Sequence, residues 1–378
     1  MLSVGGGGDG NWRVFVTRVL LVNMEKKTII TLLFSLMVIS ATAQIKPEVS
    51  EAVELMGILS RTAGFQEFSN DLAGQYSKDT EAWFAQYREH PTVAYYKDLR
   101  AKNGIGYERV TNMAVHLEIE KGKVKLVGDR TELTGGWLNV DLDDFVKRLN
   151  IFYADTRFHE FFEQHQSFYN DFLKLYDTNV MPIIHPEWYS RFYNGVEPTE
   201  LFRLIIGFTY GTTNNGASRQ LPGQQREVFA VCGYHLNPKT GRLLFDSSLP
   251  LHEFNHSFVN PLLDKDENEK IMHEVGQELF QLSQSTMEQQ HYDDWHIVIN
   301  ESLVRAAVIV YFYEHGFNQF AMNMLNIETM QNGFPWMLDV VSALRYYATH
   351  REMYPTLNDF YPEIASFFNK YTAEQKNK

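Results

Sequence analysis

The sequence predicts an α+β fold, mostly helical with a small mixed sheet. Residues 48–105, 141–177 and 250–372 carry helical patterns, the first with apolar residues at a 3.6-residue period. Short strand-like runs lie between these segments. An order of helices, then strands, then helices favours an α+β fold over a repeated β-α-β alternation.

The strand-like runs are separated by recognisable turns. Residues 115–127 alternate apolar and polar positions around Lys121-Gly122 and predict a β-hairpin. The loop at 211–225 is rich in Gly, Asn, Ser and Pro, and Asn214-Asn215-Gly216 within it is typical of a turn. A polar loop of this length could also serve as a lid over a cleft. The other runs predicted as strands are 201–210, 228–236 and a shorter one at 243–245.

The composition predicts a folded, acidic protein. Apolar residues make up 44% of the chain and aromatic residues 14%, which is enough for a sizeable core. The formal net charge is −13 with no basic block, which argues against nucleic acid as a partner, because phosphate binding needs clustered Lys and Arg. No linker divides the chain. Residues 44–378 are therefore expected to form one domain, with a helical N-terminal part (about 48–177) and a catalytic part (about 200–372).

The N-terminus has the three parts of a secretory signal peptide. A basic stretch at Met24-Glu25-Lys26-Lys27 precedes an apolar run over 28–40 and the A-x-A site Ala41-Thr42-Ala43. We expect residues 24–43 to direct export to the periplasm or the extracellular space, and residues 1–23 to be a non-native upstream extension. The alternative is an uncleaved anchor helix, but the run is short for a membrane span, so we expect no transmembrane segment in the mature chain.

The single cysteine excludes an internal disulfide. Cys232 lies in the strand-like run Val228–Cys232 and is expected to be a buried apolar residue. No cysteine directly follows the apolar run at 28–40, which argues against a lipoprotein anchor. An exported chain without disulfides must rely on its core or on a metal for stability.

The strongest chemical signal is His252-Glu253-Phe254-Asn255-His256, which matches H-E-x-x-H. Two histidines four residues apart lie on one helix face, so both imidazoles can reach one ion, and Zn²⁺ accepts such ligands. Glu253 is turned by roughly 100° from His252, which suits a general base rather than a ligand.

The surrounding residues favour a helix around this motif. Ser247 or Ser248 can cap it, Pro250 suits its first turn, and Asn260-Pro261 is expected to end it. Its apolar residues, which share one face away from the histidines, are Leu251, Phe254 and Phe258. One side of the helix can then pack while the other meets a cleft.

Glu301 is the candidate third ligand. It lies on a second predicted helix, which Asp293 or Asp294 can cap and Gly316 can stop. Its helical neighbours at −4, +3 and +7 are Ile297, Val304 and Val308. A carboxylate in such an apolar stripe is costly unless it is paired or binds a metal. A purely structural ion pair with Arg305, one turn later, is the alternative.

An H-E-x-x-H helix followed by a helix bearing Asn300-Glu301 resembles the gluzincin group of zincin metallopeptidases. The resemblance implies a zincin-like active-site helix and makes Glu301 the third zinc ligand. Many gluzincins place Asp four residues after that Glu, to support a ligating His. Here that position holds Arg305.

The chain also resembles an exported bacterial family known only as a domain of unknown function. The resemblance rests on Val53–Met56 and on the segment L-H-E-F-x-H-S-F-x-N-P over Leu251–Pro261. It would cover most of the mature chain, and it implies nothing about the substrate.

A peptidase also needs a group that stabilises the developing oxyanion. Arg305, Tyr311 and His315 are the candidates on the Glu301 helix, and Tyr346 and His350 lie further along the chain. None of them has a diagnostic spacing. His273-Glu274 repeats the H-E pair without a second histidine at position 277, so no second site is expected there.

These observations predict a zinc-dependent hydrolase with one Zn²⁺ per chain. His252, His256 and Glu301 would hold the metal, and Glu253 would act as general base on a peptide or protein substrate. A strand within 226–245 could align an extended peptide, by analogy with zincins. The alternatives are a non-catalytic exported binding protein that keeps the fold, or a zinc hydrolase acting on a non-peptide substrate.

Overall fold

Helices form most of the chain before the sheet, as predicted. The structure, a computed structural model, describes residues 45–195, 199–234, 236, 240, 242–290 and 292–377. The expected signal peptide at 24–43 and the extension at 1–23 lie outside these residues. The helices of the first part are α2 (Glu51–Thr62), α3 (Gln75–Phe84), α4 (Pro91–Asn103), α5 (Glu108–Val115), α6 (Leu142–Asp155), α7 (Phe158–Gln164) and α8 (Gln166–Asn179).

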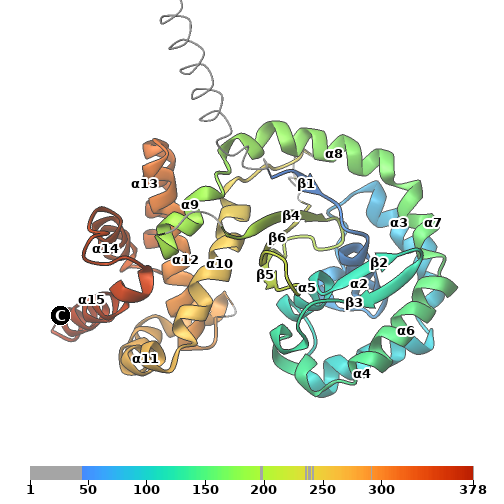
Figure 1. Ribbon diagram of the computed structural model, residues 1–378, viewed down its shortest axis with the longest axis horizontal. Helices are drawn as coiled ribbons and strands as arrows, with labels where there is room; N and C mark the ends of the chain where they lie inside the picture. Colours follow the sequence, from blue (N-terminus) through green and yellow to red (C-terminus); the bar gives the residue numbers. More distant parts are fainter. Residues whose placement is uncertain are drawn as a thin grey trace, which may run out of the picture. The chain divides into compact units, whose positions relative to one another are not determined.

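A small mixed sheet stands at the centre of the described chain (Figure 1). Its strands, in spatial order, are β1 (Pro47–Glu48), β4 (Leu201–Gly207), β6 (Glu227–Gly233) and β5 (Asn215–Arg219). β1 and β6 run parallel to β4, while β5 runs antiparallel to β6. Together with the surrounding helices, this sheet confirms the predicted α+β class.

The predicted hairpin is present as β2 (Leu117–Glu120) and β3 (Lys123–Leu126). Leu117 pairs with Leu126 in an antiparallel register. Lys121 and Gly122 have positive φ angles of 52° and 73°, the conformation that a two-residue type I′ turn requires.

The prediction of a loop at 211–225 was wrong in part, because this segment contains β5. Asn215 and Gly216, expected in a turn, open this strand, and Asn215 pairs with Val231. The small residues that suggested a loop are suited to this strand, because Gly216 passes close to the helix that carries Glu253 and His256. The expected strand at 243–245 is reduced to an isolated bridge between Leu236 and Leu243.

The second half of the chain is helical from Ser248 onward, beside the sheet in Figure 1. Its helices are α10 (Ser248–Leu263), α11 (Asp266–Gln289), α12 (Trp295–Glu314), α13 (Asn318–Met330), α14 (Met337–Thr349) and α15 (Leu357–Lys376). The short helix α9 (Glu187–Tyr189) lies earlier in the chain, before β4. Short turns of 3₁₀ or π geometry lie at Gln66–Phe68, Ala85–Tyr87, Arg130–Glu132, Gly135–Asn139, Met181–Ile183 and Ser190–Asn194.

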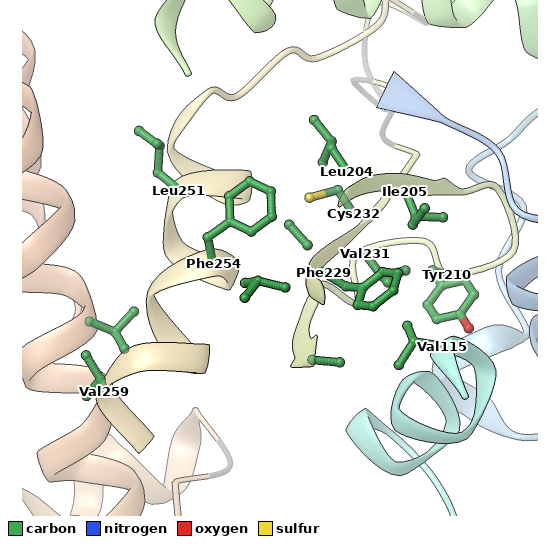
Figure 2. Close-up of a cluster of buried hydrophobic side chains, with 14 of the residues drawn as sticks. Val115, Leu204, Ile205, Tyr210, Phe229, Val231, Cys232, Leu251, Phe254 and Val259 are labelled. Atoms are coloured by element: carbon green, nitrogen blue, oxygen red, sulfur yellow. The ribbon is translucent and has the colours of Figure 1, made fainter. Parts of the chain in front are cut away.

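α10 packs its apolar face on the sheet. Leu251 and Phe254 are fully buried, and Phe254 points towards Leu204 of β4 and Cys232 of β6 (Figure 2). Phe258, one turn further along, is buried as well. Cys232 is a buried free cysteine, as predicted.

Pro261 does not end α10, contrary to expectation. The helix continues to Leu263 with Pro261 inside it. Proline has no N–H to donate to the carbonyl four residues earlier, so Ser257 O loses its helical partner. Nη2 of Arg226, immediately before β6, donates to that oxygen instead at 3.1 Å.

α12 is the most apolar helix that the structure describes. Its length and a mean hydropathy of 1.3 would suit a membrane span, yet 78% of that window is buried inside the fold. It packs against α10, α11, α13 and α14. This burial is typical of a central core helix.

Candidate metal centre

α10 presents its motif residues on two different faces. His252 and His256 lie on the face turned away from the sheet and are only partly buried, whereas Glu253 is buried. The helix begins at Ser248, whose N–H donates to Asp246 Oδ1 at 2.8 Å. Ser247 occupies the N-cap position, as expected, but its side chain makes no capping hydrogen bond, and Asp246 supplies the acceptor instead.

α12 brings Glu301 to the same place. Asp294 caps this helix by accepting a hydrogen bond from His296 N–H at 2.6 Å, as predicted. Gly316, with a φ angle of 81°, follows its end. Glu301 is buried, and the apolar residues Val304 and Val308 on its stripe are buried too.

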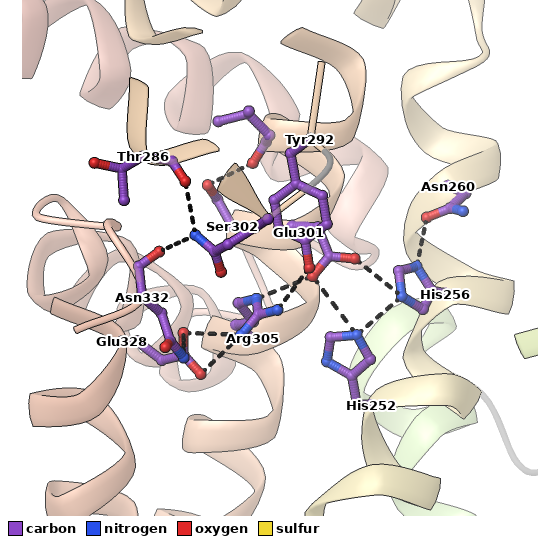
Figure 3. A network of polar contacts seen from close by, with 12 residues as sticks. His252, His256, Asn260, Thr286, Tyr292, Glu301, Ser302, Arg305, Glu328 and Asn332 are labelled. Atoms are coloured by element: carbon purple, nitrogen blue, oxygen red, sulfur yellow. Dashed lines mark hydrogen bonds and ion pairs between the residues drawn. The ribbon is translucent and has the colours of Figure 1, made fainter. Parts of the chain in front are cut away.

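The imidazoles of α10 face the Glu301 carboxylate of α12 (Figure 3). His252 Nε2 lies 3.6 Å from Glu301 Oε2, and His256 Nε2 lies 3.4 Å from Glu301 Oε1. The two Nε2 atoms are 3.0 Å apart. These three residues could hold one metal ion, since their ligand atoms all lie within 4.8 Å of one another.

The charges of His256 and Glu301 suit a cation. Burial, followed by the neighbouring His252, lowers the pKa of His256 to about 4, so its ring is neutral at pH 7. Burial opposes ionisation of Glu301, but His252 and Arg305 outweigh it and hold the pKa of its carboxyl group below the usual range. For His252, burial is outweighed by Glu301, and the pKa is raised.

Asn260 orients the second histidine. His256 Nδ1 and Asn260 Oδ1, one helical turn apart, are separated by 3.1 Å. An amide oxygen can only accept, so Nδ1 carries the proton and Nε2 keeps its lone pair towards Glu301. Such an outer hydrogen bond is typical of metal-binding histidines.

Arg305 connects Glu301 to α13. Its Nε donates to Glu301 Oε2 at 2.9 Å, and its Nη1 donates to both carboxylate oxygens of Glu328, at 3.0 and 2.9 Å. Nη2 donates to the hydroxyl of Tyr292 at 2.8 Å. The ion pair that was the structural alternative for Glu301 is therefore present, and it coexists with the approach to the histidines.

Glu253 lies against the sheet edge. Burial raises the pKa of its carboxyl group to about 7, although His252 and a hydrogen bond from the backbone of Gly216 act in the opposite direction. A Cβ at Gly216 would overlap the carbonyl oxygen of Glu253 and lie 3.1 Å from Cβ of His256. Only glycine lets β5 approach α10 this closely.

Two of the sequence-predicted residues lie away from this centre. Tyr311 and His315 come ten and fourteen residues after Glu301, roughly 15 and 21 Å along the helix axis. The Tyr311 hydroxyl donates to Ile183 O at 2.6 Å and accepts from His185 N–H at 2.8 Å. The His315 ring stacks on His185 at a centroid distance of 4.8 Å. Both fasten the chain near residue 185, and their proposed role at the site was wrong.

Of the remaining oxyanion candidates, one lies at the centre and two lie away from it. Arg305 does contact the centre, whereas His350 Nδ1 bonds Tyr346 O at 2.8 Å and the two rings stack on each other. His273, where no second site was expected, pairs with Glu269 on the exposed side of α11.

Sequence reasoning missed Tyr292, Glu328 and Gly216. Tyr292 lies in the connection between α11 and α12, and Glu328 belongs to a different helix from its partner. No spacing relates either residue to the H-E-x-x-H motif. Only the turn-like composition around Gly216 marked that position, and it indicated the wrong conformation.

The comparisons with known proteins give a family without an activity. No curated protein and no solved structure matches the chain. A family model described as a domain of unknown function (DUF4932) matches residues 44–367. That match spans nearly all of the part that carries the fold and the candidate metal centre, and the chain belongs to this DUF4932 family.

Proposed function

We propose that this protein is a zinc-dependent hydrolase, specifically a metallopeptidase that holds one zinc ion per chain. The observation that carries the proposal is the convergence of His252 and His256 from α10 with Glu301 from α12. Glu253 completes the H-E-x-x-H pattern beside them.

The donor set fits zinc. Two imidazole nitrogens and one carboxylate oxygen are the ligands of many catalytic zinc sites, with a fourth position left open. Bonds of 2.0–2.1 Å in a tetrahedron place neighbouring ligand atoms about 3.3 Å apart. The separations of 3.0, 3.4 and 3.6 Å lie close to that spacing. When bound, the metal supplies a Lewis acid that polarises a carbonyl group and acidifies a water molecule.

Glu253 is the proposed proton carrier. Its buried carboxyl group has a pKa raised to about 7, so it can exchange a proton near neutral pH. As base it would take the proton of the attacking water, and as acid it would return that proton to the leaving amine. Its position between His252 and Gly216 holds the carboxyl group beside the centre.

β5 is the proposed guide for an extended peptide. We expected a strand within 226–245 to align the substrate, but β6 already pairs with β4 on one side and β5 on the other. β5 is the terminal strand of the sheet and passes Glu253 and His256 at Gly216. Addition of a strand at such an edge is a common mode of peptide binding.

Tyr292 is the proposed oxyanion donor in place of Tyr311 and His315. Its hydroxyl lies at Arg305 Nη2, and burial followed by the nearby Glu301 raises its pKa. The phenol therefore stays protonated and can donate to a carbonyl oxygen that becomes negative. Arg305 adds a positive charge at the same place.

The resemblance to gluzincins supports Glu301 as the third ligand, but the two differ at the position four residues later. The Glu of the second helix, Glu301, occupies the position of the third ligand in that group. Four residues later this chain has Arg305 where many gluzincins have Asp. Here Glu328 and Tyr292, which contact the guanidinium, surround the position instead.

Metal analysis tests the proposal first. Purified, dialysed protein should contain about one zinc per chain, and His252→Ala should lose it because one of three protein ligands is gone. Glu253→Gln should keep zinc, because Glu253 is not a ligand. Protein that neither contains zinc nor takes it up would rule out the metallohydrolase.

Hydrolysis is measured with a peptide library read by mass spectrometry. The Glu253→Gln variant should cleave at least about 10²-fold more slowly than the unmodified protein, since general-base catalysis is lost. Cleavage that survives this change would come from another source. A zinc-loaded protein that cleaves no peptide would favour a non-catalytic binding protein or a hydrolase of another substrate class.

A further inference from the structure

Arg226 joins the edge strand to the motif helix. Its Nη2 donates to Ser218 Oγ on β5 at 2.9 Å and to Ser257 O on α10 at 3.1 Å. Ser257 is the residue after His256, and its carbonyl is the one that Pro261 leaves without a helical partner. The guanidinium therefore stands where β5 and α10 meet.

The guanidinium contacts β5 two residues from the point where this strand passes the motif helix. Gly216 marks the point where β5 passes Glu253 and His256. Ser218 is two residues further along and on the same face of the strand, which is about 7 Å at the rise of a β-strand. A peptide extended along β5 would therefore reach Arg226 about two residues away from a bond placed at the metal.

Arg226 has unused donors. Both of its hydrogen bonds to described residues use Nη2, and a guanidinium has five N–H groups. Within the part of the chain that the structure describes, no carboxylate oxygen lies within 4.0 Å of this side chain. Glu200 and Glu132 act on it only from a longer distance, and burial lowers its pKa.

This setting differs from that of the other arginines near the sheet, Arg203 and Arg219. Arg219 contacts Glu227 and Glu118, and Arg203 contacts Glu48 and Glu227. Each of those cations is balanced by carboxylates of the chain itself. A half-buried cation without such a partner gains most from a carboxylate supplied by a ligand, because charge-assisted bonds of this kind are strong.

We propose that Arg226 binds a carboxylate of the substrate about two residues from the cleaved bond, so that the enzyme favours peptides with an acidic group there. The inference rests on the proposed function, because β5 must carry the peptide. The carboxylate comes from an Asp or Glu side chain or from a free C-terminus. The chain has 47 acidic and 34 basic residues, so an acidic peptide needs a dedicated cation at this place.

Peptide binding is measured first, independently of turnover. The zinc-loaded Glu253→Gln protein is titrated with fluorescent peptides that carry either Asp or Asn at each position, and either a free or an amidated C-terminus. The favoured carboxylate should tighten binding by about 10- to 100-fold, as expected for a charge-assisted pair in a partly buried place. The Asp/Asn pairs and the acid/amide pairs distinguish a side chain from a C-terminus.

Variants of Arg226 separate recognition from a structural role. In the same background, Arg226→Gln should abolish the preference for the carboxylate, and Arg226→Lys should keep part of it. Arg226→Glu should invert it, so that peptides with Lys at that position bind best. Ser218→Ala is the matched control, because it removes one bond of the guanidinium and keeps its charge, and the preference should remain.

Each outcome has a defined meaning. A preference that persists in Arg226→Gln, or no preference in the parent protein, would overturn the inference. If the Gln and Glu variants fail to fold, the acid/amide comparison on the parent protein and on Arg226→Lys decides. A preference for carboxylates without any cleavage by the native protein would contradict the proposed peptidase function but would still support Arg226 as a binding site for carboxylates. Cleavage by the native protein without a preference for carboxylates would support the proposed function and overturn the inference about Arg226.

Discussion

Arg305 Nε and Glu301 Oε2 form a 2.9 Å ion pair one turn apart on α12, on the side of the carboxylate that faces away from His256 Nε2. The pair fixes the carboxylate plane, while Glu328 balances the remaining charge of the guanidinium. The candidate ligand is thus held by a neighbour on its own helix and by a second carboxylate on α13.

Arg305→Met should weaken zinc binding by about 10- to 100-fold, because residues that orient ligands contribute that much to metal affinity. It should also cost about 3–5 kcal/mol of stability, since Glu328 is left buried without its partner. A chelator competition and a denaturant titration measure the two effects. The double variant Arg305→Met with Glu328→Gln should recover stability without recovering affinity. Equal recovery of both would contradict a role in positioning Glu301.

Tyr292→Phe should lower kcat by about 10²-fold and leave zinc content and KM nearly unchanged, because the hydroxyl is proposed to act only on the developing oxyanion. Steady-state kinetics on a cleaved peptide from the library provide the measurement. Tyr311→Phe is the matched control. Its hydroxyl bonds the chain at residues 183 and 185, so kcat should stay the same while stability falls. A Tyr292 variant with unchanged kcat would remove this residue from the mechanism.

Gly216→Ala should separate β5 from α10, because its methyl group would overlap the Glu253 carbonyl oxygen. Overpacking of this kind costs about 1–3 kcal/mol, and the displaced Glu253 should lower activity as well. Gly223→Ala provides the comparison, since no atom lies within 4 Å of its would-be Cβ and only its φ of 72° resists the change. Activity that falls only in the Gly216 variant would support the close approach as the cause.

Glu54 should make stability depend on pH. Burial raises the pKa of this carboxyl group from 4.5 to about 7, against hydrogen bonds from Tyr76 and from the backbone of Phe208 and Thr209. Between these two values the folded state keeps the proton and the unfolded state loses it. Stability from this group is therefore complete below about pH 4.5 and falls as pH rises towards 7, by roughly 3 kcal/mol in all.

Glu54→Gln removes this titration, so the stability advantage of the unmodified protein over the variant should shrink between pH 4.5 and pH 7. Denaturant titrations across this range, with chelator present for both proteins, measure the difference. A gap that stays constant with pH would mean that Glu54 ionises normally in the folded chain.

The sequence predicted those parts of the centre that depend on local periodicity. His252, Glu253 and His256 follow from one helical repeat, and the apolar stripe around Glu301 follows from another. Tyr292 and Glu328 could not be found in this way, because they meet Arg305 only through the packing of α11 and α13 on α12. Tyr311 and His315 were misplaced because they share the helix of Glu301 but lie several turns further along it.

The errors in secondary structure have physical causes of the same kind. Asn215 and Gly216 have turn propensity, but pairing with β6 and the close approach of α10 override it. Pro261 was expected to stop a helix, yet Arg226, which is distant in sequence, supplies the missing donor. Local rules describe a segment in isolation, whereas these positions are decided by neighbours from elsewhere in the chain.

The placement of the ligands on α10 and α12 has a mechanical consequence. His256 and Glu301 bracket the segment 257–300, which contains α11, a helix with few buried residues along its length. An ion bound to both would close this segment into a ring and remove much of the entropy that its local opening releases. Hydrogen exchange of α11 amides should then slow when the ion is present, and a chelator should open α11 to proteases before the sheet loosens.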